Sequence, residues 1–231
     1  MNLGYVGITF PFELDDVDIE NKKNIALYVK ALEHKNHSFK NILEIGSGLG
    51  GGCYVLQKYY NYKDITGTDF LKINTHYCTK QKKYKGIKFI TIPAEEIQKL
   101  QLKYELIISI EAGLFFNNWD SFINNIKDVL AENGQFIYED LVITKDIQLI
   151  EYKMASANLK IIHSENITNG VLQSMYETQK PVKNPSILYN LLKKIFRIKN
   201  TNQYDGYKDS KIYNDLVNGD LVYMKYVLMI K

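Results

Sequence analysis

Cysteine and histidine are scarce in this chain. Its 231 residues include two cysteines, Cys53 and Cys78, and four scattered histidines. Two cysteines are too few for a disulfide framework, and neither residue type shows the spacing of a zinc site. We therefore expect a reducing compartment and no bound metal.

Long apolar runs and a strong excess of one charge are also missing. No stretch reaches the roughly 18 apolar residues of a membrane-spanning helix. The opening MNLGYVGITF lacks a basic start and a long apolar core, so we expect a cytoplasmic location. The net charge is only +3, and we expect no nucleic-acid partner because binding a phosphate backbone needs a dense Lys/Arg field.

Predicted strands and helices alternate along most of the chain. Because 45% of the residues are hydrophobic, we expect one α/β domain over residues 1–231, with a mostly parallel sheet covered by helices on both faces. The predicted strands are 41–45, 64–69, 87–92, 104–110, 135–142 and 159–163, with 221–230 as a closing edge strand. The predicted helices are 18–33, 50–60, 71–83, 94–100, 119–130 and 145–157. The helix over 119–130 is expected to end at the cap pair Asn133-Gly134.

Two segments lie outside this alternation. Residues 1–38 are expected to form an N-terminal helical cap. Residues 166–216 are too long for an ordinary connection, so we expect a lid insertion before the last strand.

The sequence NILEIGSGLGGG, residues 41–52, is typical of a ligand-binding turn. Five glycines in seven positions allow positive φ and close approach of a ligand to the backbone. Gly46, Gly48 and Gly51 also satisfy the G-x-G-x-x-G pattern of dinucleotide-binding folds, with Asp69 near the distance of a ribose contact. Glu44 lies at the end of the predicted strand, just before the turn, and gives the pattern E-x-G-x-G.

Acidic residues recur where the predicted strands end. Glu44, Asp69, Pro93 to Glu95, Glu111 and Asp140 each follow a strand, and ligands of open α/β sheets bind outside these carboxyl ends. Any one of these acids could be a solvated loop residue, but their recurrence indicates a shared crevice.

NILEIGSGLGGG, ITGTDF, IPAEEI and YELIISIEAGLFFNNWDSFINNIKDVLAENGQFIYEDL resemble successive motifs of class I S-adenosylmethionine (SAM) methyltransferases, small-molecule branch. The opening MNLGY and the closing YKDSKIYNDLVNGDLVYMKYVLMIK resemble the phthiotriol/phenolphthiotriol dimycocerosate methyltransferase-like group. The resemblance implies a Rossmann-like fold, SAM as cofactor, and O-methylation of a secondary metabolite, polyketide or lipid alcohol or phenol.

The resemblance also implies roles for individual residues. Glu44 and the glycine turn would line the methionine and ribose region, Asp69 would accept from the ribose hydroxyls, and Phe70 would lie against the adenine. The implied cofactor-binding residues are Tyr5, Glu44, Gly46, Ser47, Gly48, Asp69, Phe70, Ala94, Glu95, Ile110 and Glu111.

The chain departs from the family at two places. Pro93-Ala94-Glu95 stands where the family has Asp-Ala-Glu, and no histidine occurs in residues 113–116. Asp140 is then the first candidate for a catalytic base, with Glu111 and Glu139 as weaker alternatives. A base matters most for an aliphatic hydroxyl acceptor and little for a neutral amine. N-methylation of a small amine and a non-catalytic SAM-binding protein therefore stay open.

The part of the site that would bind the methyl acceptor is predicted to be apolar. Leu114, Phe115 and Phe116 are expected to line the substrate pocket, whereas Trp119 is expected in the core. Residues 187–199 alternate apolar and basic positions at helical spacing, which fits either a solvated face or peripheral contact with anionic lipid. The oligomeric state is open, a homodimer included.

Overall fold

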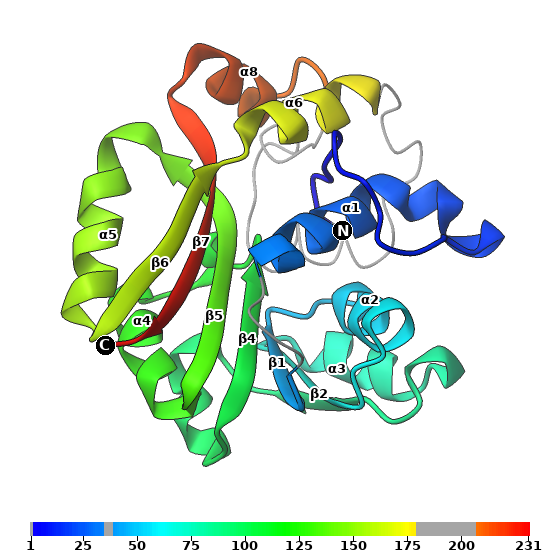
Figure 1. The fold of residues 1–231 in the computed structure, drawn as a ribbon, viewed down its shortest axis with the longest axis vertical. Coiled ribbons are helices and arrows are strands. Elements are labelled where there is room, and N and C mark those ends of the chain that lie inside the picture. Colours follow the sequence, from blue (N-terminus) through cyan, green and yellow to red (C-terminus); the bar gives the residue numbers. More distant parts are fainter. Residues whose placement is uncertain (1, 35–38, 179–206) are drawn as a thin grey trace.

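A seven-stranded sheet forms the centre of the computed structural model, which describes residues 2–34, 39–178 and 207–231 (Figure 1). The strands lie in the order β3-β2-β1-β4-β5-β7-β6. Their bounds are β1 (Asn41–Ile45), β2 (Asp64–Asp69), β3 (Lys88–Thr91), β4 (Tyr104–Ile110), β5 (Leu130–Ile143), β6 (Leu159–Asn166) and β7 (Leu221–Ile230). The first five strands are parallel to one another, and β7 is antiparallel to both of its neighbours.

Helices cover both faces of the sheet, as Figure 1 shows. One face packs against α1 (Lys22–Ala31), α2 (Gly51–Tyr60), α6 (Thr168–Glu177) and α8 (Lys211–Asn218). The other face packs against the 3-10 helix η4 (Ala94–Leu100), α4 (Trp119–Val129) and α5 (Ile147–Ser156). The predicted α/β fold with a mostly parallel sheet is therefore confirmed.

The shorter elements connect this framework. The helix α3 (Lys72–Thr79) follows β2, and the 3-10 helices are η1 (Asp16–Asn21), η2 (Leu32–His34), η3 (Lys82–Tyr84), η5 (Gly113–Phe115) and η6 (Thr144–Asp146). The predicted helix over 18–33 is thus split, with regular α-helix only in α1. Among the described residues, no helix has both the length and the apolar character to cross a membrane.

The prediction that residues 221–230 form an edge strand was wrong. The strand β7 lies between β5 and β6, and Val222 to Leu228 are buried. A strand that is covered on both faces needs a near-continuous apolar sequence, and LVYMKYVLMI is one apart from Lys225. The true edge at this side is β6, whose burial alternates residue by residue.

The prediction of a helix cap at Asn133-Gly134 was also wrong. The helix α4 ends at Val129, and both residues belong to β5, where neither has positive φ. A Cβ on Gly134 would lie 3.0 Å from the carbonyl oxygens of Tyr104 and Glu105. This glycine lets β5 approach β4 closely rather than ending a helix.

The described residues include only part of the predicted lid insertion over 166–216. The strand β6 extends to Asn166, and α6 and α8 occupy the two ends of 166–216. The basic segment 187–199 lies outside the described residues. The lid and the N-terminal cap over 1–38 stay predictions.

Candidate cofactor and acceptor site

The glycine turn links β1 to α2 in a backbone that ordinary residues rarely adopt. Gly46 has φ of 74°, and the Ser47 N–H donates to the Thr68 carbonyl at 2.8 Å, which ties the turn to β2. A Cβ on Gly46 would lie 2.5 Å from the Ala112 Cβ, and one on Gly52 would lie 2.0 Å from Glu44 Oε1. Glycine at these positions therefore makes room for the turn and for the acid beneath it.

Glu44 lies under this turn and is only 2% exposed. The Tyr28 hydroxyl donates to its Oε1 at 2.6 Å. Burial raises the pKa of Glu44, and hydrogen bonds from Cys53 and Tyr28 oppose that rise. Within the described part of the chain, Glu44 Oε2 and the nearby Ser47 Oγ have no hydrogen-bond partner.

These orphaned oxygens test whether the residues fit SAM. A buried acceptor without a donor costs free energy unless a ligand supplies the donor. The methionine end of SAM carries an ammonium, and its ribose carries hydroxyls, so both oxygens could be satisfied by this cofactor. The predicted binding residues Glu44, Gly46, Ser47 and Gly48 thus lie together with unused hydrogen-bonding capacity.

Asp69 ends β2 and holds the turn from the other side. Its Oδ2 accepts from the Gly48 N–H at 2.9 Å, and its Oδ1 accepts from Leu71 N–H at 2.8 Å and Asn74 Nδ2 at 3.1 Å. Burial raises the pKa of Asp69, and these three hydrogen bonds oppose the rise. Because a carboxylate has about four acceptor positions, roughly one remains for a ribose hydroxyl. The adjacent Phe70 is 39% exposed, and its predicted contact with the adenine stays a prediction.

The third of the family motifs, Pro93-Ala94-Glu95, contacts another loop of the chain. Ala94 is buried, and Glu95 Oε1 accepts from the Asn118 N–H at 3.0 Å and from the Asn117 N–H. Glu95 therefore anchors the loop that follows β4. Its predicted contact with the cofactor stays a prediction, as does that of the buried Ile110.

Glu111 connects the end of β4 to the N-terminal segment. It has φ of 52°, and its Oε1 accepts from the Leu3 N–H at 2.8 Å and the Tyr223 hydroxyl at 3.0 Å. Burial raises the pKa of Glu111 to about 7, and the Leu3 N–H opposes that rise. Tyr5 lies in the same N-terminal segment and packs on α6, where a Cβ on Gly170 would lie 2.2 Å from the tyrosine ring.

Asp140 lies beneath the turn that follows β4. Its Oδ2 accepts from the Gly113 N–H at 2.7 Å, and the Tyr138 hydroxyl lies 3.4 Å away. Burial raises the pKa of Asp140 to about 6, and the hydrogen bonds from Gly113 and Leu141 oppose that rise. The side chain is 1% exposed, so it is covered by the turn rather than open to solvent.

The outer side of the same turn is apolar. Leu114 is 55% exposed and Phe115 is 51% exposed. Phe116 is half-buried and packs on Phe122, with ring centroids 4.3 Å apart, and Trp119 packs against the same core. Of the predicted substrate-binding residues, Leu114 and Phe115 therefore offer the open surface.

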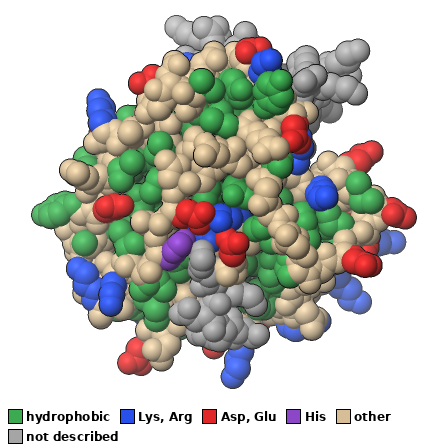
Figure 2. All heavy atoms as spheres, turned by 45° about the horizontal axis from the view of Figure 1, so that its top comes forward, with side chains coloured by type: hydrophobic (Ala, Val, Ile, Leu, Met, Phe, Trp, Pro, Cys, Tyr) green, Lys and Arg blue, Asp and Glu red, His purple; other side chains and the backbone are tan. Residues whose placement is uncertain are grey.

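A row of acidic and lysine side chains, buried at Glu139 and Lys225 and partly exposed at Glu165, lies beside the site on the face that carries α1. Glu139, Lys225 and Glu165 are direct neighbours across β5, β7 and β6. Lys30 of α1 pairs with Glu165 at 2.8 Å and with Glu33 at 2.6 Å. Figure 2 shows acidic, lysine and histidine side chains gathered at one point of the face it views. Glu139, one of the two weaker catalytic candidates, belongs to this row.

Three residues that form hydrogen bonds with the predicted site residues were not predicted from the sequence. Tyr28 holds Glu44, Tyr223 holds Glu111, and Leu3 donates to Glu111 through its backbone. Tyr28 lies within the predicted helix over 18–33, and its hydroxyl was the only available signal. Leu3 gave no signal in the sequence, because its contact uses a backbone N–H, which every residue except proline has.

Together, the parallel sheet with one antiparallel strand near its end, the acid-and-glycine turn and the acid after β2 define the class of SAM-dependent methyltransferases. A model of the methyltransferase-domain family matches residues 36–206, and the chain belongs to that family. The cofactor is therefore S-adenosylmethionine, as the sequence predicted.

Named relatives agree with this class. The chain is 25% identical over 162 residues to a fatty-acid O-methyltransferase of Mycolicibacterium smegmatis, covering 70% of this chain and 59% of that protein. It is 24% identical over 213 residues to a phthiotriol/phenolphthiotriol dimycocerosates methyltransferase of Mycobacterium leprae, covering 92% of this chain and 78% of that protein. The resemblance to this second group is thereby confirmed.

Solved structures show the same fold. One is the O-methyltransferase of a trans-AT polyketide synthase multienzyme of Brevibacillus brevis, in complex with S-adenosyl-L-homocysteine. It matches with a TM-score of 0.67 at 15% identity, over 93% of this chain and 75% of that chain.

Proposed function

We propose that this protein methylates an oxygen atom of a hydrophobic small molecule, such as a lipid or polyketide alcohol or phenol of secondary metabolism. The observation that carries the proposal is the turn after β4, which presents exposed Leu114 and Phe115 above the buried Asp140. An apolar surface next to a carboxylate fits an acceptor with a long apolar body and one reacting hydroxyl. The names of the relatives support the same acceptor class.

When bound, SAM supplies a methyl group on a positively charged sulfur that an oxygen can attack. The chain's main task is then to hold the acceptor oxygen in line with that methyl group. We propose Asp140 as the acceptor of the hydroxyl proton, since with a pKa of about 6 it is mostly ionised at neutral pH. Glu111, with a pKa of about 7, is the second candidate.

Isothermal titration with S-adenosylhomocysteine and radiolabelled methyl transfer test the proposal in two steps. The acceptors are a long-chain fatty acid, a long-chain alcohol, a phenol and a primary amine. We expect tight binding and transfer to the hydroxyl compounds. Transfer only to the amine would support N-methylation instead, and binding without transfer to any acceptor would support a non-catalytic SAM-binding protein.

Three further features belong to this proposal. We propose that residues 187–199 contact anionic lipid, that the protein works in the cytoplasm, and that nucleic acid is not among its partners. Vesicle binding by the variant Lys193→Gln/Lys194→Gln, compared with the parent, tests the first. Light scattering during gel filtration decides between a monomer and a homodimer.

A further inference from the structure

The segment from Phe70 to Ala94 carries a concentrated positive charge. It contains six lysines and no Asp or Glu, in a chain whose net charge is only +3. The lysines are Lys72, Lys80, Lys82, Lys83, Lys85 and Lys88, and all of them are exposed. The small net charge of the whole chain conceals this local excess.

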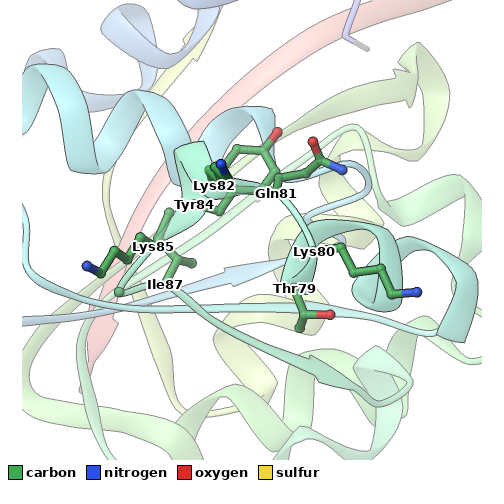
Figure 3. Close-up of a pocket in the computed structure, with 8 residues that line it drawn as sticks. Thr79, Lys80, Gln81, Lys82, Tyr84, Lys85 and Ile87 are labelled. Atoms are coloured by element: carbon green, nitrogen blue, oxygen red, sulfur yellow. The ribbon is translucent and has the colours of Figure 1, made fainter.

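Three of these lysines lie at a hollow beside α3 and η3, which has a volume of about 590 Å³. Lys80, Lys82 and Lys85 line it, and Figure 3 shows Lys80 and Lys85 extending in opposite directions from it. The side chains therefore spread their charge over a broad surface rather than converging on one point. Such an arrangement suits an extended anionic surface better than a single small anion.

The charge of this surface is not neutralised within the described part of the chain. None of the six lysines there forms a salt bridge, whereas Lys30 and Lys58 each pair with two carboxylates. Lys83 lies over the rings of Tyr54 and Tyr84 instead, at 5.5 and 5.0 Å from their centroids. Lys88 begins the edge strand β3 and could serve to prevent strand pairing. The lysines of residues 80–85 precede that strand and cannot have this role.

The helix α3, which directly precedes Lys80 to Lys85 in the chain, exposes two apolar side chains. Ile73 is 47% exposed and Tyr77 is 43% exposed, one helical turn apart, while Asn74 and Cys78 on the inner side are buried. Phe70, at the start of the same segment, is 39% exposed. Exposed apolar residues among lysines are typical of helices that lie at the surface of an anionic membrane.

We propose that the surface formed by α3, η3 and the start of β3, here called the lysine face, docks on a bilayer that contains anionic phospholipid. The lysines attract the lipid phosphates, and Ile73 and Tyr77 enter the boundary between headgroups and acyl chains. A nucleic acid would meet the lysines but leave these two side chains against phosphate. The inference goes beyond the proposed function and does not depend on methyl transfer.

The test compares two variants of equal charge on the full chain. Lys80→Gln/Lys82→Gln/Lys85→Gln changes the lysine face, and Lys127→Gln/Lys145→Gln/Lys160→Gln changes three exposed lysines elsewhere. Flotation with vesicles of phosphatidylcholine and phosphatidylglycerol measures binding, with pure phosphatidylcholine vesicles for comparison. We expect the parent to bind only the anionic vesicles, the first variant to bind on the order of a hundred-fold more weakly, and the second to change little.

Ile73→Asn/Tyr77→Asn provides a second, independent variant, which should weaken binding at high salt as well as at low salt. Equal loss in the two lysine variants, no loss in either, or no vesicle binding by the parent would overturn the inference. Binding of a DNA or RNA duplex through the same lysines, without vesicle binding, would assign the surface to nucleic acid. Titration with S-adenosylhomocysteine shows that each variant is folded, and it separates this result from any failure of the proposed methyl transfer.

Discussion

Glu139 on β5 and Lys225 on β7 face each other across the sheet, and both side chains are 0% exposed. Burial raises the pKa of Glu139 to about 8, although the nearby Lys225 opposes that rise. Burial also lowers the pKa of Lys225. Neither oxygen of Glu139 has a hydrogen-bond partner in the described part of the chain, so this acid is held protonated near neutral pH.

Glu139 therefore makes the stability of the protein depend on pH. In the unfolded chain it ionises near its ordinary pKa of about 4.5, but in the folded chain only near 8. Between these values the folded state binds the extra proton, so the free energy of unfolding should fall as the pH rises, by up to about 1.4 kcal/mol per pH unit. Urea unfolding of the parent and of Glu139→Gln between pH 5 and 8 measures this slope. The variant should make this slope smaller and leave the part that the buried acids Glu111 and Asp140 contribute, whereas Glu132→Gln, at an exposed position of the same strand, should leave the slope unchanged. Identical slopes in all three proteins would contradict the assignment.

Glu44 should govern affinity for the cofactor. Glu44→Gln removes the negative charge but keeps an oxygen that can accept from the Tyr28 hydroxyl. A charge-assisted hydrogen bond is worth about 1.5–3 kcal/mol, so we expect S-adenosylhomocysteine to bind roughly 10- to 100-fold more weakly. Isothermal titration measures the change, with Glu132→Gln as the control. An unchanged dissociation constant would remove Glu44 from the binding site.

Gly46 should be irreplaceable even by alanine. The added methyl group would lie 2.5 Å from the Ala112 Cβ, on a residue with φ of 74°. We expect a loss of at least about 2 kcal/mol in the free energy of unfolding, together with weaker cofactor binding. Gly51→Ala is a matched control, because nothing lies within 4 Å of its added Cβ. Thermal unfolding compares the two variants, and equal melting temperatures would disprove the steric argument.

Asp140 should act in methyl transfer and not in cofactor binding. We expect Asp140→Asn to slow turnover about 100-fold or more and to leave the affinity for S-adenosylhomocysteine unchanged. In the parent, activity should rise with pH through about 6 as Asp140 loses its proton, and the variant should lack this limb of the profile. Asp128→Asn, at an exposed site, is the control. If turnover by Asp140→Asn equals that of the parent, another group takes the proton or none is needed.

Much of the candidate cofactor site could be predicted from the sequence, because it depends on local patterns. The strands 41–45, 64–69 and 104–110 have the predicted bounds, and Glu44 and Asp69 lie at two strand ends beside the glycine turn. Glycines at required backbone positions and acids at strand ends leave a signal within a few residues.

Features that depend on contacts distant in the sequence could not be predicted in this way. The position of β7 follows from its pairing with β5 and β6, and Lys225 interrupted the apolar run that would have revealed an interior strand. The contacts of Glu95 with Asn117 and Asn118, and of Glu111 with Leu3 and Tyr223, join segments that no spacing relates.

The interior position of β7 has a consequence for biosynthesis. Its two neighbours, β5 and β6, are made first, and neither can pair along this side until residues 221–230 have left the ribosome. A nascent chain that has reached β6 therefore carries unpaired strand edges next to apolar surface, the feature that chaperones shield and that promotes aggregation. Completion of the sheet therefore waits for β7, and slow translation of the segment before β7 would prolong the vulnerable state.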